Sequence, residues 1–286
     1  MSYWIVQLLN AVQASMLLFL VAVGLGVVFG LMNVVNLAHG AFYAFGAYLG
    51  WTVLQATGSF PLAFLLAPAL TGLPGLAVYA LAVARMQRAG HLAQVIATLG
   101  LLFVSVEALR ALWGDIPLEF PVPPALAGSV DILGTPYPVY RLSVVALGLA
   151  VAALLWLVLS RTIAGAMVRA AVDNVEMAAA LGVRTGLLFP VVFVLGCALA
   201  GLGGVVAAPL LSVHPGMGVE VLVPALVVVV VGGLGSLQGT LVGALLVGLA
   251  DTFGAVMGPQ LSGAAVYALL AAVLVLRPGG LLPARS

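Results

Sequence analysis

Long apolar stretches follow one another from one end of this chain to the other. Most are long enough to cross the roughly 30 Å hydrocarbon core of a bilayer as an α-helix. Lipid offers the peptide backbone no hydrogen-bonding partner, so such stretches fold as helices that satisfy their own backbone groups. The sequence therefore predicts an all-α integral membrane protein, a polytopic bundle in a single transmembrane domain over residues 1–286.

Hydropathy divides the chain into about nine spans, within a range of roughly eight to ten. The predicted spans are 5–29, 40–57, 61–84, 92–113, 139–160, 187–210, 220–235, 239–257 and 262–277. Glycine and alanine recur at close spacing within them, and such faces let neighbouring helix backbones approach each other. We expect tight helix packing at most of these glycines.

Composition agrees with this class and excludes others. Hydrophobic residues make up 64% of the chain and charged residues 6%, whereas about a quarter of a soluble domain is charged. The nine arginines nearly balance the eight acidic residues, which gives no indication of a nucleic-acid partner. Cys197 is the single cysteine and the three histidines are far apart, so neither a disulfide framework nor a metal site is expected. The sequence shows neither a phosphate-binding motif nor a catalytic motif, so we expect neither an enzyme nor a cofactor.

The arginines predict the orientation of the spans. Seven of the nine fall on one predicted side, which the positive-inside rule makes cytoplasmic. These seven are Arg85, Arg88, Arg161, Arg169, Arg184, Arg277 and Arg285. The proline-rich segment 114–138 then forms an irregular external loop. The N-terminus is expected outside and the C-terminus in the cytoplasm, and the first residues lack the features of a cleaved secretory signal.

Two segments that combine glycines with polar residues interrupt the apolar pattern. The first holds Asn33, Asn36, His39 and Gly40, and the second holds Gly232, Gly233, Gly235 and Ser236. Each precedes a span rich in glycine and alanine, which resembles a weak internal duplication about 200 residues apart. In transporters, broken or re-entrant segments such as those predicted near 33–40 and 232–239 mark the substrate pathway. The alternative is a pair of tight turns at the cytoplasmic surface.

Ionisable residues inside the spans are further candidates, because a charge in lipid is costly. Asp251 has no partner nearby in sequence and is added to the predicted pathway residues. Glu107 and Arg110 are three residues apart, so they are expected to neutralise each other as a structural ion pair. His39 is expected to be a hydrogen-bonding residue and not a metal ligand or proton relay.

The polar segment 161–186 lies between two long spans and holds three arginines. Asp173 and Glu176 begin a predicted short helix, and Gly182 follows as its C-terminal cap. Its alanines suit close approach to another protein, whereas a helix lying on a membrane would show Trp or Phe. The predicted contact residues are Gly165, Arg169, Ala170, Asp173, Asn174, Ala178, Ala179, Leu181 and Gly182. The alternative is a solvated loop that only joins two spans.

These motifs resemble those of a known family. Asn36-Leu-Ala-His39-Gly40, followed by Gly46-Ala-Tyr48, is similar to a signature of the membrane permeases of branched-chain amino acid ABC importers. The segment 165–183 and the run Val231-Gly-Gly-Leu-Gly-Ser236 resemble later motifs of the same family. The resemblance covers nearly the whole chain in the family's order and is greatest to the LivH-type subunit. Gly203-Gly204 departs from the Ala-Gly expected there.

The resemblance implies an importer in the bacterial inner membrane. Two permeases would form the pathway at their interface, two ABC ATPase subunits would bind from the cytoplasm, and a periplasmic binding protein would deliver the substrate. The second permease would be a paralogue or another copy of this chain, and segment 161–186 would be the coupling loop. Related importers carry urea, short amides and other amino acids, so the substrate stays open.

Two functions from different classes therefore remain. The first is the permease subunit of an ABC importer, driven by separate ATPases. The alternative is a self-sufficient secondary transporter or channel for a small polar solute, which would use Asp251, Glu107 and His39 for ion coupling. The scarcity of carboxylates inside the spans and the polar segment 161–186 favour the permease.

Overall fold

The computed structural model describes residues 2–32, 34, 36–86, 90–258 and 260–282, apart from the side chains of Ser2 and His91. Each predicted span contains one apolar helix. These helices are α1 (Ser2–Met32), α2 (His39–Thr57), α3 (Phe60–Val78), α5 (His91–Trp113), α6 (Val139–Arg161), α9 (Thr185–Ala207), α10 (Met217–Gly232), α11 (Leu237–Met257) and α12 (Leu261–Leu276). Within the described residues, six helical regions are long and apolar enough to cross a membrane, and α10 and α12 are shorter. The all-α class is confirmed, and the number of nine spans stays a prediction.

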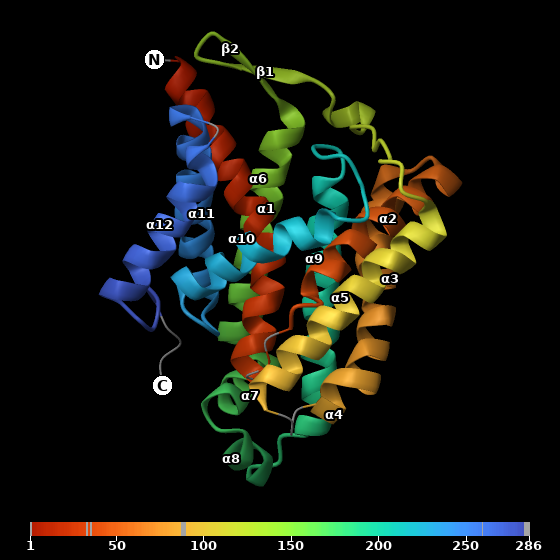
Figure 1. Cartoon of the computed structure of the whole chain (residues 1–286), viewed down its shortest axis with the longest axis vertical. Coiled ribbons are helices and arrows are strands. Elements are labelled where there is room, and N and C mark those ends of the chain that lie inside the picture. Colours follow the sequence, from red (N-terminus) through yellow and green to blue (C-terminus); the bar gives the residue numbers. More distant parts are fainter. Residues whose placement is uncertain (1, 33, 35, 87–89, 259, 283–286) are drawn as a thin grey trace.

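Helix α1 extends along most of the bundle (Figure 1). It packs against α9 and α11, and α9 packs in turn against α2 and α3. Glycines bring these backbones together. A Cβ atom at Gly24 would lie 2.5 Å from the carbonyl oxygen of Gly196, and one at Gly46 would overlap the backbone of Gly201. The predicted glycine packing is confirmed at both crossings.

The apolar core lies where α1, α2, α9, α10 and α11 meet. Phe19, Phe42 and Phe193 are buried there, and the rings of Phe42 and Phe193 meet edge to face with centroids 6.3 Å apart. Many leucines on α3, α5 and α6 are exposed instead. Such apolar exposure is expected of helix faces that meet lipid.

The third predicted span is a helix in three parts. Helix α3 continues into one turn of π-helix (η1, Tyr79–Val83) and then into the short α4 (Ala84–Met86). Ser59 caps the start of α3, where its side chain accepts a hydrogen bond from the backbone N–H of Leu62. The predicted end of this span near residue 84 lies within two residues of the observed end.

Segment 114–138 is more regular than predicted. It contains a turn of 3-10 helix (η2, Pro124–Leu126) and an antiparallel hairpin of β1 (Ser129–Ile132) and β2 (Thr135–Pro138), with Ile132 opposite Thr135. Leu133 and Gly134 have φ of 52° and 80°, as in a type I′ turn. The prediction of an irregular loop is therefore wrong for the hairpin. Leucine rarely occupies the first turn position, so the sequence carried no clear hairpin signal.

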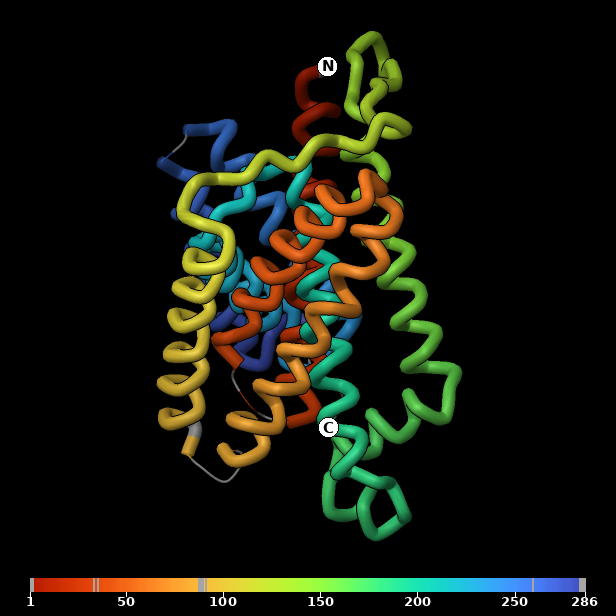
Figure 2. Tube along the Cα trace, turned by 90° about the vertical axis from the view of Figure 1, so that its right-hand side faces the viewer, coloured from red at the N-terminus to blue at the C-terminus, as the bar shows by residue number. Residues whose placement is uncertain are grey.

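The two ends of the bundle carry different segments. The N-terminus and the hairpin lie at one end, and α4, α7 (Ile163–Asp173) and α8 (Val175–Ala180) lie at the other (Figure 1). Figure 2 shows the α7–α8 segment projecting beyond the bundle, while the segment that leads to the hairpin crosses the opposite end. Of the seven arginines predicted to lie on one side, Arg88 and Arg285 fall outside the described residues.

Candidate functional site

The break between α1 and α2 lies inside the bundle. Helix α2 begins at His39, whose Nε2 atom donates a hydrogen bond to the carbonyl oxygen of Val21 at 3.0 Å. Val21 lies well before Met32, where α1 ends. Because a helix rises about 1.5 Å per residue, Val21 and the end of α1 are roughly 16 Å apart along the helix axis. The chain therefore turns back into the bundle before α2 starts. Asn33 falls outside the described residues.

Polar atoms at this break have no protein partner. Asn36 and His39 are fully buried, and within the described structure neither the Oδ1 nor the Nδ2 atom of Asn36 makes a hydrogen bond. The same holds for Nδ1 of His39, which is an acceptor when Nε2 carries the proton. An unsatisfied buried polar group destabilises a fold by about 1–3 kcal/mol. Such groups call for a water molecule or a ligand, so this break fits a pathway better than a surface turn.

Gly40 has a packing role at the same break. A Cβ atom on Gly40 would overlap the carbonyl oxygen of Gly218, and a Cβ atom on Gly218 would overlap that of Gly40. The start of α2 and the start of α10 thus touch backbone to backbone. Gly40 fixes the position of the break against α10, and its predicted place in the pathway stays a prediction.

The break between α10 and α11 is a capped turn. Gly233 and Gly235 have φ of 109° and 75°, and the side chain of Ser236 accepts a hydrogen bond from the N–H of Gly239 at 3.0 Å. Beyond α12, Leu281 and Leu282 donate backbone hydrogen bonds to the last carbonyls of α10 at 2.9 Å each. The predicted pathway residues Gly232 and Gly233 therefore belong to a satisfied turn. Gly232 also packs directly against the backbone of Gly239.

Gly235 and Ser236 border a separate cleft next to α7. It has a volume of about 340 Å³, and Arg169 and Asp173 line its other side. A neighbouring depression shares Arg169 and Ser236 and adds Gln238. The second break thus contributes to a mostly aliphatic cleft near the α7–α8 end of the molecule, which holds a few polar groups, and not to the buried polar site at the first break.

Asp251 has a partner that sequence spacing did not indicate. Its Oδ1 atom accepts a hydrogen bond from the hydroxyl of Ser262 on α12 at 2.5 Å. The carboxylate also lines a cavity of about 370 Å³ together with Gln13, Tyr43 and Arg141. Sequence reasoning missed these three residues, because they lie on α1, α2 and α6, all far from α11 in the sequence.

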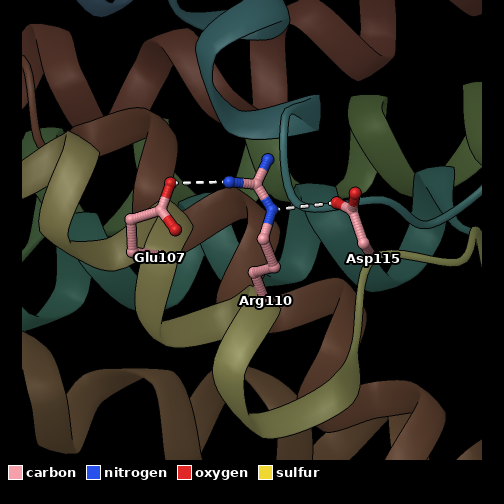
Figure 3. Close-up of polar contacts among 3 residues, drawn as sticks. All are labelled: Glu107, Arg110 and Asp115. Carbon is pink, nitrogen blue, oxygen red and sulfur yellow. Dashed lines mark hydrogen bonds and ion pairs between the residues drawn. The ribbon is translucent and has the colours of Figure 1, made fainter.

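The predicted ion pair of Glu107 and Arg110 is present, and Asp115 joins it as a third charged residue. Arg110 Nη1 lies 2.6 Å from Glu107 Oε1, and Arg110 Nε lies 2.9 Å from Asp115 Oδ1 (Figure 3). All three side chains are well exposed at the end of α5. The cluster is therefore structural, and these groups are not part of the buried polar site.

The segment 161–186 forms two capped helices. Thr162 caps α7 by accepting from the N–H of Gly165, and Asn174 caps α8 by accepting from the N–H of Met177 at 2.8 Å. After α8 the N–H groups of Gly182 and Val183 bond to the carbonyls of Ala179 and Ala178 at 3.0 Å, with φ of 93° at Gly182. This is a Schellman motif, so the predicted cap at Gly182 is confirmed.

The predicted contact residues of this segment divide into two groups. Gly165 and Ala178 are buried: a Cβ atom on Gly165 would overlap the last carbonyls of α6, and Ala178 packs with Leu31 of α1 and Val192 of α9. Ala170 is half-buried. The side chains that face outward are those of Arg169, Asp173, Asn174, Ala179 and Leu181, and Gly182 is exposed with them. Met177, which was not predicted, adds a further exposed apolar group.

Known proteins identify the family of the chain. A family model described as branched-chain amino acid transport system / permease component matches residues 7–277. The chain belongs to this family. The resemblance read from the motifs is thereby confirmed, and the chain is a permease component of an ABC-importer family.

Curated members of the family match most of the chain. The high-affinity branched-chain amino acid transport system permease protein BraD of Pseudomonas aeruginosa is 28% identical over 98% of this chain and 96% of that protein. The corresponding protein LivH of Escherichia coli K12 is 26% identical over 82% of this chain and 80% of that protein. The solved structure of PsaBC from Streptococcus pneumoniae in complex with Fab aligns with 93% of this chain and 89% of its own, at 14% identity and with a TM-score of 0.48.

Proposed function

We propose that this chain forms one half of the translocation pathway of a binding-protein-dependent ABC importer for branched-chain or related amino acids. The family match and the names of its relatives support this assignment. A second permease, either a paralogue or another copy of this chain, would form the other half. Two ABC ATPase subunits would supply the energy, so this chain itself would not hydrolyse ATP, and a periplasmic binding protein would supply the substrate.

The construction of the α7–α8 segment carries this proposal. Both helices are capped at their N-termini and α8 at its C-terminus, so the segment is a defined unit and not a loose connection. Its inner side is bound to α1 and α9 through Ala171 and Ala178, while Ala179, Leu181 and Arg169 face outward. A unit with a bound inner face and a free outer face suits a docking site for the ATPase.

Helix α1 offers a route from this docking site to the pathway. Leu31 of α1 packs against the α7–α8 segment, and Gly30 approaches the second break so closely that a Cβ atom would lie 2.5 Å from Cα of Gly235. Val21, roughly 15 Å further along α1, holds His39 at the first break. A displacement of α7–α8 would therefore reach both breaks through one rigid helix.

The proposal includes an orientation and a location. The α7–α8 end would face the cytoplasm, and segment 114–138 with the N-terminus would face the periplasm. All nine apolar helices would lie in the bacterial inner membrane, with α2, α10 and α12 crossing only part of its thickness or tilting within it. The arginines of the α7–α8 end support this orientation through the positive-inside rule.

A secondary transporter is less well supported. Glu107 is exposed and bound to Arg110, so it is not available for ion coupling within the pathway. Co-purification separates the two functions: a tagged chain extracted from native membranes should bring ABC ATPase subunits with it. Ion-driven uptake by the purified chain alone would instead establish the secondary transporter.

The coupling role has its own test. Ala179→Trp places a large side chain on the exposed face of α8, and Ala127→Trp makes the same change at an exposed position of the opposite end. We expect Ala179→Trp to insert in the membrane but to lose ATPase co-purification or at least about 90% of ATP-driven uptake. Ala127→Trp should retain both. Normal assembly and uptake of Ala179→Trp would show that α8 is not the coupling element.

A further inference from the structure

The cavity beside Asp251 is built at the meeting point of several helices. Its volume is about 370 Å³, which lies in the lower part of the range of about 300–1,000 Å³ for small-molecule sites. Residues from α1, α2, α6, α10, α11 and α12 line it. Arg141, in the first turn of α6, places it toward the end of the bundle that carries the N-terminus.

Two opposite charges line this cavity without pairing. Arg141 and Asp251 both contribute to the wall, and within the described structure no ion pair forms between them or with any third residue. Both residues are part-buried, and a charge that is partly removed from water is stabilised by an oppositely charged partner. A cavity with one unpaired cation and one unpaired anion is therefore suited to a ligand that carries both charges.

Each of the two charges is held in place by a neutral neighbour. Nη1 of Arg141 donates to Oδ1 of Asn10 at 2.7 Å, and the hydroxyl of Tyr137 donates to the same oxygen at 3.1 Å. Burial raises the pKa of Tyr137, although Arg141 partly offsets this, so the hydroxyl stays a donor. Ser262 donates to one oxygen of Asp251. The remaining donors of Arg141 and the second carboxylate oxygen of Asp251 stay free for a ligand.

Two further polar side chains of the cavity lack partners. Gln13 is only 7% exposed and Tyr43 only 3%, and both line the cavity. Neither side chain makes a hydrogen bond to any residue that the structure describes. Neither the Gln13 amide nor the Tyr43 hydroxyl is among the enclosed polar atoms that lack a partner, so both groups keep accessible surface at the cavity, where a ligand or water can bind them.

The rest of the wall is aliphatic. Leu17, Val247 and Val266 line the cavity on α1, α11 and α12. An apolar wall with a few convergent polar groups is the usual composition of a small-molecule site. Here it would receive an aliphatic side chain, while the charged groups would receive the polar end of the same molecule.

The cavity adjoins the buried break at His39. Leu17 lies one helical turn from Val21, the residue that binds His39, and Tyr43 lies one turn from His39 itself on α2. The cavity and the buried polar atoms of Asn36 and His39 are therefore consecutive levels along the same pair of helices. A solute leaving the cavity toward the α7–α8 end would meet the break next.

We propose that this cavity binds a zwitterionic α-amino acid with an aliphatic side chain, an inference that rests on the function proposed above. Arg141 binds the α-carboxylate, for which a guanidinium has matching geometry, and Asp251 binds the α-ammonium group. Gln13 and Tyr43 add neutral hydrogen bonds. A neutral amide or urea would leave both charges uncompensated, so the cavity selects against the uncharged substrates of related importers.

Ligand binding to the intact permease–ATPase complex tests this selection directly. In the absence of the binding protein, leucine at about 50 mM should raise the melting temperature of the wild-type complex, because this concentration is well above a Kd on the order of 1 mM. Leucinamide, 4-methylpentanoate and isobutyramide each lack one or both charges and should not. Arg141→Gln and Asp251→Asn should abolish the shift by leucine. A shift of equal size with isobutyramide, or none with leucine, would overturn the proposal.

ATP-driven leucine uptake into proteoliposomes that hold the complete importer provides the second measurement. Arg141→Gln and Asp251→Asn should lower uptake about tenfold or more, as expected when a hydrogen bond to a charged group is lost. Arg110→Gln and Glu107→Gln change charges outside the cavity and should keep uptake near the wild-type rate. Arg141→Lys retains the positive charge and should restore part of the uptake.

The outcomes separate this inference from the proposed function. If the wild-type chain recruits no ATPase and shows no ATP-driven uptake, the proposed function itself fails. If wild-type uptake is normal and both cavity variants transport leucine at wild-type rates, only the amino-acid site is wrong. Leu17→Trp, which fills the cavity without removing a charge, should also block uptake with ATPase co-purification intact, and it decides the question if Arg141→Gln does not assemble.

Discussion

The two breaks in the helical pattern look alike in sequence and differ in the structure. Both combine glycines with small polar residues, and both precede a helix rich in glycine and alanine. At the first, α2 begins deep inside the bundle, and Asn36 and His39 are buried with unsatisfied atoms. At the second, Ser236 caps α11 and the C-terminal segment bonds to the last carbonyls of α10. The same kind of motif thus forms a buried polar site in one place and a closed turn in the other.

The energetic difference between the breaks shows which one has a role beyond folding. An unsatisfied buried polar group destabilises the fold by about 1–3 kcal/mol, and the first break contains three such atoms on two residues. A group that destabilises the fold is expected where a ligand, an ordered water or a second conformation satisfies it. The second break has no comparable group among the described residues, so its glycines are explained by backbone geometry and packing alone.

The largest effect is expected from disturbing the backbone contact that positions the first break. Gly40→Ala would push a methyl group into the carbonyl oxygen of Gly218 and separate α2 from α10. Overpacking of this kind costs about 1–3 kcal/mol or more, which corresponds to a fall of several degrees in melting temperature. Gly100→Ala, at a helical glycine of α5 with open space around its Cβ position, is the matched control. Equal melting temperatures would mean that the contact is not rigid.

Asn36→Leu should separate stability from transport. The change removes an amide that has no partner and keeps a side chain of similar size, so we expect the melting temperature to stay equal or to rise slightly. Uptake should fall about tenfold, because the buried polar group at the first break is lost. Thermal unfolding and ATP-driven uptake, measured on the same preparation, provide the test. A destabilised variant with normal uptake would show that Asn36 serves the fold and not the pathway.

Ser236→Ala should have the smallest effect on uptake and, in contrast to Asn36→Leu, should lower the melting temperature. Loss of the hydrogen bond to Gly239 removes a helix cap and costs about 1 kcal/mol, or a few degrees in melting temperature. Uptake should remain near the wild-type rate. A tenfold loss of uptake at unchanged stability would contradict the contrast between the two breaks and would return Ser236 to the pathway.

Much of the architecture follows from local sequence. Apolar runs placed all nine apolar helices of the described structure, because a run of this kind in lipid satisfies its backbone groups as a helix. The cap at Gly182 follows equally from residue type, since a flexible glycine acts on its own neighbours. The predicted helix start at Asp173 was wrong, because Asp173 ends α7 and Asn174 caps α8, which begins at Val175. The hairpin in segment 114–138 escaped prediction because Leu133 takes a left-handed conformation that leucine seldom adopts.

The candidate sites depended on contacts that no local pattern encodes. Gly165 and Ala178 resemble their exposed neighbours in sequence, yet they are buried because α7 and α8 fold back onto α6, α1 and α9. Gln13, Arg141 and Asp251 carry no shared motif, and only the packing of α1, α6 and α11 places them in one cavity.

The sequence by itself determined the class of the protein, its family and the positions of its helices, because hydrophobicity, capping and glycine spacing act over a few residues. Only the tertiary structure decided which break is buried, which face of α7–α8 is free and which charges meet across a cavity. Those properties depend on where helices more than one hundred residues apart come to lie. That placement is set by side-chain and backbone packing over the whole bundle, which no short segment of sequence contains.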